Sequence, residues 1–499
     1  MNKFLRAFII CISTISLQAS AQVGTLDPSF GTGGKVTTDF GATQIAYNVV
    51  IQSDGKLVAG GLSYNEAILL ARYETDGTPD STYGVNGQVN IPYNVNVGGI
   101  YGTGMAIQPD DKILIAAYTG NDSILLVRFE TNGLPDPSFG SGGFIKVYTG
   151  FSTGARISVA LQDSGKIIVY FGLASNSNDI ALARFTSTGN LDNTFGNNGI
   201  VSSNFTSDYT GSVAIQPDGK ILVSGAYVVS SAFRMMLVRY TYDGILDTTF
   251  STDGFAEPFL GNLESLGHCV ILQSDGKIIV AGKFNVGMAM ARYHPDGTID
   301  STFGNYGLVV AAFNGISDCY AIGLQQDGKI ILGGVLSSPS TNLDFCAARY
   351  NSNGILDTSF NSIGYVSTDF ATAYDFALSL VIQPDGKIVL AGEQTGAGNV
   401  HNFALARYLG DVTVGINESQ NSDLKIFISP NPFSDKLNLK TTGVREIKLY
   451  DLAGKIIFDK KINSAEISLS TENLSPGYYL LQADDGKQVS YFKIVKQQN

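Results

Sequence analysis

The chain has 499 residues, a net charge of −12 and 44% hydrophobic residues, with 57 glycines but only 15% charged residues. This composition excludes an intrinsically disordered chain and is typical of a β-rich protein with many tight turns. Of the 32 basic and 44 acidic side chains, residues 426–499 hold 10 and 8, and residues 1–21 hold two basic ones. Residues 22–425 therefore carry a net charge of −16, which argues against a nucleic-acid partner.

Residues 1–21 have the pattern of a secretory signal peptide. Lys3 and Arg6 precede a short apolar run from Phe8 to Leu17, and Ala19-Ser20-Ala21 offers a small-residue cleavage site. The apolar run is too short to span a bilayer, and no later segment is long enough. We expect a mature chain that begins near Gln22, has no transmembrane segment, and is secreted or held at the outer cell surface.

Three motifs recur seven times each between residues 22 and 410. They are a turn such as Gln216-Pro217-Asp218-Gly219-Lys220, a strand such as Leu405-Ala406-Arg407-Tyr408, and a segment such as Leu191-Asp192-Asn193-Thr194-Phe195-Gly196. The repeated lysines are Lys56, Lys112, Lys166, Lys220, Lys277, Lys329 and Lys387. The repeated arginines are Arg72, Arg128, Arg184, Arg239, Arg292, Arg349 and Arg407. The repeated aromatics are Phe30, Tyr83, Phe139, Phe195, Phe250, Phe303 and Phe360. Successive lysines recur at an interval of about 55 residues, a period typical of solenoids, propellers and arrays.

Each unit has the pattern of four strands. Around Lys220 we expect strand a near 200–204, strand b near 212–216, strand c at 220–224 and strand d at 235–240. The Pro-Asp-Gly order between strands b and c suits a type I turn followed by a glycine with positive φ. In the second unit Asp111 replaces that glycine and would have to adopt the left-handed conformation. Four strands per unit predict an all-β fold, a seven-bladed β-propeller of four-stranded antiparallel blades, with a solenoid as the alternative.

The spacings between the motifs are of two kinds. The turn's glutamine and lysine are always four positions apart, and the interval from the repeated arginine to the next aromatic is the same in all six cases, as at 72–83. By contrast, the lysine-to-arginine segment is shortest at 277–292 and longest at 329–349, and the aromatic-to-glutamine segment is shortest at 195–216 and longest at 83–108. In an up-and-down sheet the two fixed connections share one face, and the two variable connections share the other. Because loops that vary on a rigid scaffold usually carry binding, we expect the variable face to be functional and the turn face structural.

The repeated arginines place charges in apolar strands, which is costly unless they are paired. They form either a ring of anion-binding groups or, as uniform repetition favours, a structural clasp to connector carbonyls or to repeated aspartates. These aspartates are Asp27, Asp80, Asp136, Asp192, Asp247, Asp300 and Asp357. We expect the lysine after each turn to be solvated rather than to form a functional basic ring. The Asp-Gly turns lack the dense carboxylates of a calcium loop, so turn chemistry explains them better than Ca²⁺ binding.

The candidate ligand contacts are polar residues on the variable face that break the symmetry of the repeat. They are Tyr64, Tyr93, Tyr118, Tyr209, Glu264, His268, Glu393 and His401. Loops rich in Tyr, Asn, Ser and Gly suit adhesive contacts. A carboxylate pair such as Glu264 and Glu393 would suit acid–base chemistry on a glycan if the two lay close together.

The sequence contains no nucleophile elbow, phosphate-binding loop or zinc motif. The three histidines lack metal-ligand spacing. Cys269, Cys319 and Cys346 lie in expected strands and favour buried free thiols over disulfides. We therefore assign no catalytic residue, metal or cofactor.

The units, with Gln-Pro-Asp-Gly-Lys, Leu-Ala-Arg-Tyr and Leu-Asp-x-x-Phe-Gly, resemble the delta-60 repeat family of bacterial β-propellers over residues 24–409. All three motifs recur, so the resemblance is specific. It implies a propeller fold and brings no established activity with it.

Residues 426–499 have alternating apolar strands separated by Gly, Asn and Asp turns, which predicts a small antiparallel β-sandwich. They also resemble the C-terminal sorting domain of type IX secretion. The resemblance rests on Pro430-Asn431-Pro432-Phe433, Ile447-Lys448-Leu449-Tyr450-Asp451, Pro476-Gly477-Tyr478-Tyr479-Leu480-Leu481 and Lys493-Ile494-Val495-Lys496. It implies the type IX machinery as a partner, passage across the outer membrane, and cleavage, for which the polar linker 411–425 is suited.

The leading functional hypothesis is a secreted or cell-surface, non-enzymatic binding or adhesion module for an unknown extracellular glycan or protein. The alternative is a secreted enzyme acting on a glycan or another polymer at the variable face. The two ends of the repeat region add a structural expectation. Asp27 and Phe30 have no arginine strand before them, and Arg407 has no connector after it. Seven complete connectors form only if the ends meet, so we predict that residues 24–34 close the ring against the seventh unit.

Overall fold

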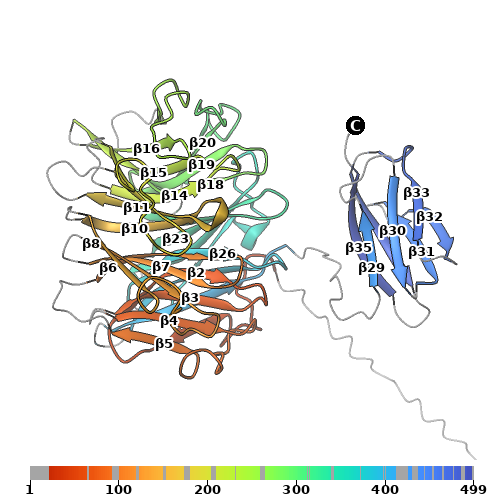
Figure 1. Cartoon of the computed structure of the whole chain (residues 1–499), viewed down its shortest axis with the longest axis horizontal. Helices are drawn as coiled ribbons and strands as arrows, with labels where there is room; N and C mark the ends of the chain where they lie inside the picture. The colour runs from red at the N-terminus through yellow and green to blue at the C-terminus, as the bar shows by residue number, and fades with distance from the viewer. Residues whose placement is uncertain are drawn as a thin grey trace, which may run out of the picture. The chain divides into compact units, whose positions relative to one another are not determined.

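The computed structural model describes residues 22–411 and 425–496, apart from short stretches at 64–66, 93–99, 120–122, 150–152, 174–179, 204–208, 231, 259–263, 312, 314, 339–341, 371–372, 397, 399, 430–435, 443, 452–454, 463–465, 476 and 485–488. The signal peptide predicted for residues 1–21 lies outside them. The contacts divide the chain into two units, 1–411 and 412–499, and each is described by itself. Regular structure in the described residues is β-strand apart from two short 3-10 turns, η1 (Asp163–Gly165) and η2 (Phe360–Ser362) (Figure 1).

The first unit consists of seven four-stranded antiparallel sheets, or blades. The innermost strands are β2 (Gln44–Ile51), β6 (Ile100–Ile107), β10 (Thr153–Leu161), β14 (Tyr209–Ile215), β18 (Ser265–Leu272), β22 (Ser317–Leu324) and β26 (Asp375–Ile382). The second strands are β3 (Leu57–Ser63), β7 (Ile113–Thr119), β11 (Ile167–Leu173), β15 (Ile221–Val229), β19 (Ile278–Phe284), β23 (Ile330–Ser338) and β27 (Ile388–Thr395). The third strands are β4 (Ala67–Tyr73), β8 (Ser123–Phe129), β12 (Ile180–Phe185), β16 (Ala232–Tyr240), β20 (Gly287–Tyr293), β24 (Asn342–Tyr350) and β28 (His401–Tyr408). The outermost strands are β5 (Gln88–Pro92), β9 (Phe144–Tyr148), β13 (Ile200–Ser203), β17 (Phe255–Ala256), β21 (Leu308–Val310), β25 (Tyr365–Thr368) and β1 (Lys35–Thr38).

The seven blades form a closed ring. Each innermost strand contacts the innermost strand of the blades on both sides, and the last, β26, contacts the first, β2. A solenoid would leave its first and last units apart. The predicted seven-bladed propeller is therefore confirmed.

The ring is closed by the N-terminal segment, as predicted. Strand β1 pairs with β28 of the seventh blade, from Lys35 opposite Ala406 to Thr38 opposite Phe403. Just before it, Leu26 bridges Tyr408. The outermost strand of the last blade thus comes from the start of the repeat region.

The expected grouping of strands within one unit needs a correction. The sequence placed strand a near 200–204 with strands b, c and d that follow it. In the structure this strand, β13, is instead the outermost strand of the preceding blade, paired with β12. A blade therefore runs b, c, d and then the next strand a. The assignment of fixed and variable connections to opposite faces is unaffected, because alternate connections still share one end.

Turn chemistry follows the sequence closely. In the fourth blade the Gln216 amide donates to the Lys220 carbonyl at 2.9 Å, and Gly219 has φ +80°. In the second blade Asp111 takes the same left-handed conformation, with φ +62°, as predicted. Ser164 in the third blade also has positive φ, at +57°.

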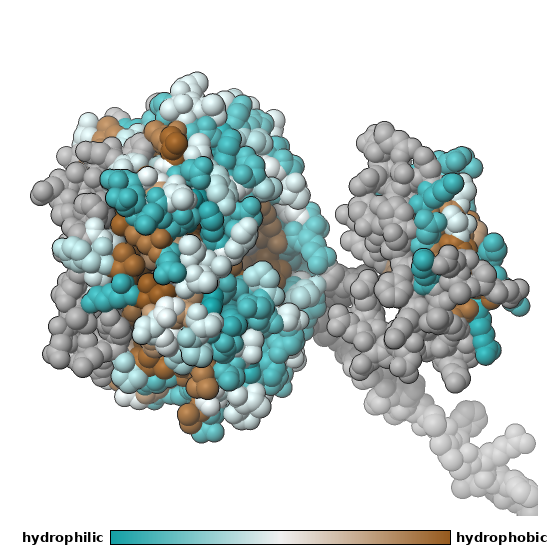
Figure 2. Space-filling model, in the orientation of Figure 1, coloured by the Kyte–Doolittle hydropathy of each residue, from teal (hydrophilic) through white to brown (hydrophobic). Residues whose placement is uncertain are grey.

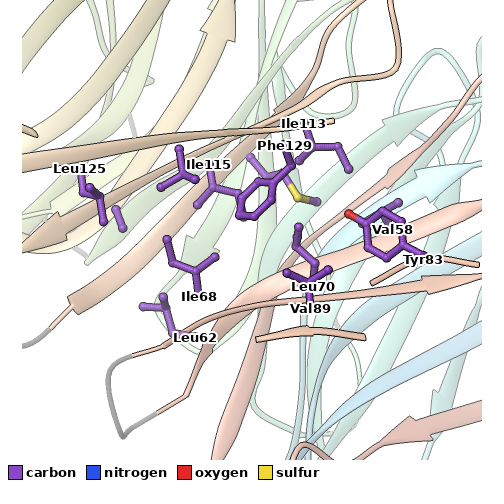
Figure 3. Packing of buried hydrophobic residues seen from close by; sticks show 13 residues of the cluster. Val58, Leu62, Ile68, Leu70, Tyr83, Val89, Ile113, Ile115, Leu125 and Phe129 are labelled. Atoms are coloured by element: carbon purple, nitrogen blue, oxygen red, sulfur yellow. The ribbon is translucent and has the colours of Figure 1, made fainter. Parts of the chain in front are cut away.

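The hydrophobic core lies between the blades. A buried cluster fills each of the seven interfaces between neighbouring blades, including the closing one, where Phe30 packs with Leu57 and Leu405. Figure 3 shows the interface of the first two blades, where Ile68 and Leu70 of β4 lie near Ile115 of β7. Every blade therefore depends on both of its neighbours. In the view of Figure 2, hydrophobic side chains reach the surface in patches between polar ones.

The second unit has seven strands in two antiparallel sheets. One contains β29 (Lys425–Ser429), β30 (Lys436–Thr442) and β33 (Glu466–Ser470). The other contains β31 (Glu446–Tyr450), β32 (Ile456–Lys461), β34 (Gly477–Asp484) and β35 (Val489–Lys496). Residues of both sheets share one buried cluster, as a sandwich requires. No helix in the described part of the chain is long and apolar enough to cross a membrane.

Candidate functional site

The repeated arginines are clasps between blades. In every blade the guanidinium pairs with the repeated aspartate eight residues later, or with Asp27 in the last blade, at 2.7–2.9 Å. It also lies 4.3–5.0 Å from the centre of the repeated aromatic ring. Arg184, which is fully buried, reaches onward to the next blade and donates to the Tyr242 carbonyl at 2.6 Å. The fixed spacing between arginine and aromatic therefore places an aromatic ring against six of the arginines, and Phe30 takes that place at Arg407.

The repeated lysines were predicted to be solvated, and this prediction is wrong. Lys56 pairs with Asp80 at 2.7 Å and with Glu74 at 2.9 Å, and only about a fifth of its side chain is exposed. The equivalent lysines of five other blades reach the repeated aspartate at 2.8–3.4 Å, and Lys329 pairs with Asp411 instead. The lysine follows the turn by one residue, so its long side chain extends along the turn face to the connector. It belongs to the clasp, and this leaves no free basic ring among these seven.

The clasp controls the ionisation of the repeated aspartates. Burial raises the pKa of Asp247, but hydrogen bonds from Thr249 and Lys220 and the charge of Arg239 outweigh it and lower that pKa to about 2. In the other repeated aspartates, too, burial raises the pKa, and hydrogen bonds and neighbouring cations lower it by more. These are Asp27, Asp80, Asp136, Asp192, Asp300 and Asp357. The turn face thus carries a ring of seven arginine–aspartate ion pairs, which suits a structural role.

The predicted ligand contacts fall in different environments. Tyr64 and Tyr93 lie outside the described residues. Tyr209 begins β14, and its side chain is not described. Tyr118 on β7 is 6% exposed and so offers little surface, whereas Glu264 is exposed just before β18.

The structure brings two of the remaining candidates together and keeps a third apart. His401 Nδ1 lies 2.8 Å from Glu393 Oε2 at the variable-face end of the seventh blade. Burial raises the pKa of Glu393, although His401 opposes the rise. Glu264 belongs to the fifth blade, so the whole sixth blade separates it from Glu393. The carboxylate pair considered for acid–base chemistry does not form.

His268 points to a feature that the sequence analysis did not single out. In every innermost strand the pairing with the second strand is interrupted by a β-bulge, at His268 in β18 and at Tyr47 in β2. Five of these strands have one extra residue, the third or fourth of the strand, and β10 and β14 have two, the third and fourth. All of them lie in the half of the strand nearer the variable face. Bulges of this kind redirect side chains and are common at binding sites.

The seven bulges together form a ring around the centre of the propeller, the bulge ring. The residue five positions before the turn's glutamine lies at this ring, and its chemical type differs from blade to blade. Its seven occupants are Tyr47, Thr103, Ile157, Gly211, His268, Tyr320 and Leu378. Two positions further along, every blade has an apolar residue, such as Val49 or Val270. The sequence shows this position as one of several columns that do not repeat.

These seven residues line a cavity of about 200 Å³ where the innermost strands meet. Asn48, Ser158, Ser212 and Cys269, each one residue further along, complete the wall. His268 Nε2 lies 3.1 Å from Asp318 Oδ1, and its ring centre is 5.0 Å from that of Tyr320. The cavity is therefore the place where residues of all seven blades converge, and its wall is asymmetric.

A group of three aspartates bears on metal binding. Asp344, Asp369 and Asp375 each offer an oxygen within 4.8 Å of the others, a grouping that the sequence analysis did not anticipate when it assigned no metal site. A Ser367 hydroxyl and the Phe370 amide already donate to two of these carboxylates. A cluster of carboxylates does not by itself establish a metal site.

The three thiols are buried and free, as predicted. Burial raises the pKa of Cys346 to about 12. It also raises the pKa of Cys319 well above its usual value, and a hydrogen bond with Cys269 acts in the same direction. These are structural cysteines rather than reactive ones.

Comparisons with known proteins agree with this architecture. The family model described as "Domain of unknown function (DUF5122) beta-propeller" matches seven segments, 52–83, 108–139, 162–195, 216–250, 273–303, 325–360 and 383–411. The model "Secretion system C-terminal sorting domain" matches residues 427–497. No curated protein matches the chain.

Several solved structures are similar to this chain at low identity. A protein of unknown function from Dyadobacter fermentans is 11% identical, with a TM-score of 0.42, over 77% of this chain and 100% of its own. A lectin from Burkholderia pseudomallei is 11% identical, with a TM-score of 0.45, over 75% and 98%. A polysaccharide lyase of family PL25, an ulvan lyase, is 11% identical, with a TM-score of 0.43, over 75% and 96%. By the family models, the seven repeats between residues 52 and 411 belong to the DUF5122 β-propeller family, and residues 427–497 are a type IX secretion sorting domain.

Proposed function

We propose that the propeller is a non-enzymatic binding or adhesion module, carried to the cell surface or the extracellular space by its sorting domain. Its ligand, an extracellular glycan or protein, engages the variable face. The observation that carries the proposal is the contrast between the two faces. On the turn face the same arginine–aspartate pair recurs in all seven blades. Near the variable face, by contrast, each innermost strand presents a different side chain to the cavity. Symmetric positions serve the scaffold, and asymmetric ones suit recognition of one ligand.

The described ionisable groups favour binding over catalysis. Glu264 and Glu393 are separated by a blade, and the cavity wall contains no Asp or Glu among its described residues. A hydrolase that uses two carboxyl groups needs them on either side of one scissile bond.

The experiment is a binding screen with a matched pair of variants. The mature chain from Gln22 is tested against arrays of glycans and immobilised matrix proteins, and hydrolysis of each ligand is measured in parallel. Glu264→Ala changes an exposed side chain at the variable face, and Asp163→Ala changes an exposed one at a turn. We expect saturable binding without turnover, weakened by variable-face substitutions and unchanged by Asp163→Ala. Binding that depends on the turn face alone would refute the proposal.

A secreted enzyme acting on a glycan or another polymer is the second candidate, and the Glu393–His401 pair is the observation that favours it. A carboxyl group whose pKa is raised by burial is suited to act as a general acid. Turnover of any ligand found in the screen, abolished by Glu393→Gln, would establish this alternative. Binding that persists unchanged in Glu393→Gln without turnover would exclude that residue.

A further inference from the structure

We propose that the cavity at the centre of the propeller binds one neutral sugar ring, such as the terminal residue of a glycan. This inference rests on the proposed binding function and assigns it a place and a ligand class. It is carried by the size of the cavity, the distribution of polar and aromatic groups around it, and the charge of its wall.

The size of the cavity limits the ligand to a single small ring. Drug-sized ligands occupy clefts from about 300 Å³ upward, so a cavity of this size suits a single sugar ring. The wall is accessible because Tyr47, Tyr320 and Leu378 are only partly buried.

One side of the cavity provides hydrogen-bond donors. The Ser158 hydroxyl oxygen accepts the Val213 amide proton at 3.2 Å, and the Ser212 oxygen accepts the Val270 amide proton at 2.9 Å. These bonds between neighbouring blades fix both oxygens, while each hydroxyl keeps its own proton to donate. Two serines on adjacent blades at the same level therefore present oriented donors to a ligand's oxygens.

A second part of the wall is aromatic. Tyr47 comes from the first blade, and His268 and Tyr320 come from the fifth and sixth. A sugar ring has one face of C–H groups and an edge of hydroxyls, so it needs aromatic and hydrogen-bonding walls together. Because the residues of the bulge ring differ between blades, the cavity has both an aromatic wall and a hydrogen-bonding wall.

The charge of the wall selects for a neutral ligand. The described lining residues include no Lys, Arg, Asp or Glu, and His268 is already paired with Asp318. Residues 22–425 carry a net charge of −16, which disfavours anionic ligands such as phosphates or uronic acids. A cation would need carboxylates in the wall.

The test is titration of the mature chain with a panel of neutral monosaccharides and with matched anionic ones, glucuronic acid and glucose 6-phosphate, followed by ligand-observed NMR and calorimetry. We expect at least one neutral sugar to bind with one site per chain and the anionic sugars to bind at least tenfold more weakly. Binding of the anionic sugars alone, or of no monosaccharide, would overturn the proposal. In the second case, glycan or protein binding in the screen would still leave the proposed function standing.

Two variants place the sugar in the cavity. Leu378→Trp fills the cavity without removing a hydrogen bond, and Ile245→Trp adds the same side chain on the turn face, where Ile245 is 67% exposed. We expect Leu378→Trp to abolish sugar binding and Ile245→Trp to leave the dissociation constant unchanged. Tyr320→Ala should weaken binding about tenfold, which corresponds to about 1.4 kcal/mol. Unfolding midpoints like that of the parent chain establish that each variant is folded, and sugar binding that survives Leu378→Trp in a folded chain would refute the cavity as the site.

Discussion

Arg407 Nε lies 2.9 Å from Asp27 Oδ2, and the two residues are 380 positions apart in the chain. In the six other blades the same contact joins residues only eight positions apart. The Arg407–Asp27 pair is therefore the equivalent of a local contact that here joins the two ends of the propeller, beside the pairing of β1 with β28. Both residues are buried, with 3% of each exposed.

The first prediction concerns this closing pair. Asp27→Asn leaves the Arg407 guanidinium buried without its anion, and the loss of one member of a buried ion pair costs about 3–5 kcal/mol. We expect the unfolding free energy to fall by about that amount, as measured by urea denaturation. Asp163→Asn, at an exposed position, is the control and should change the midpoint little. Equal midpoints for the two variants would show that the ends of the ring do not depend on this contact.

The second prediction concerns the planar guanidinium group of Arg184. Arg184 donates to Asp192, to the Tyr242 carbonyl and to Thr194, so it uses its planar geometry in three directions. Lysine keeps the charge but cannot reproduce this arrangement. Because a hydrogen bond of a charged group contributes about 1.5–3 kcal/mol, we expect Arg184→Lys to reduce the unfolding free energy by about 3 kcal/mol. Arg445→Lys, at an exposed arginine, should have no measurable effect on denaturation of the propeller.

Much of this scaffold could be predicted from the sequence, because the motifs of the repeat occur seven times in it. The constant spacing between arginine and aromatic marked a rigid connector, and the unpaired Asp27 and Arg407 at the two ends required closure. The boundaries of a blade could not be predicted in the same way. A period has no intrinsic starting point, so the strand near 200–204 was grouped with the wrong neighbours.

The candidate site was less predictable, for a physical reason. Repetition identifies what the blades share, whereas recognition depends on what they do not share. The bulge position is visible as a variable column, yet only the fold shows that Tyr47, His268 and Tyr320 face one cavity. The environment of the lysines was missed because the sequence does not show that Lys56 reaches Asp80, 24 residues later.

The third prediction concerns acid. Each repeated aspartate has a folded-state pKa below its unfolded value of about 3.9, so its stabilising effect is complete above that value and is lost as the pH falls toward the folded pKa. For Asp247 this interval runs from about pH 4 to pH 2. We expect the urea midpoint to be nearly constant between about pH 5 and 8 and to fall steeply below about pH 4. An unchanged midpoint between about pH 6 and 3 would contradict the clasp, and Asp247→Asn should make the acid slope shallower.

The fourth prediction concerns the thiols. Cys319 and Cys346 are fully buried, and burial raises the pKa of both, so neither forms a reactive thiolate near neutral pH. We expect a thiol reagent such as Ellman's reagent to leave both unmodified in the native chain at about pH 8 and to modify them after denaturation in urea. Rapid modification of Cys346 in the folded protein, located by peptide mass mapping, would contradict the packing of the interface between the fifth and sixth blades.

The last prediction separates the two units. The propeller clasps involve residues up to Asp411, and the sorting domain has its own buried cluster. Deleting residues 426–499 should therefore leave the propeller folded but remove the signal for export. In cells with a type IX system, we expect the truncated chain to accumulate in the periplasm, with the same urea midpoint as the propeller of the full chain. A double substitution in the core of the sorting domain, Leu437→Asp with Leu449→Asp, provides a matched chain of full length, because both side chains are buried there. It should show the same retention if the folded sorting domain is what the machinery recognises, whereas normal export of both chains would mean that residues before 426 direct secretion.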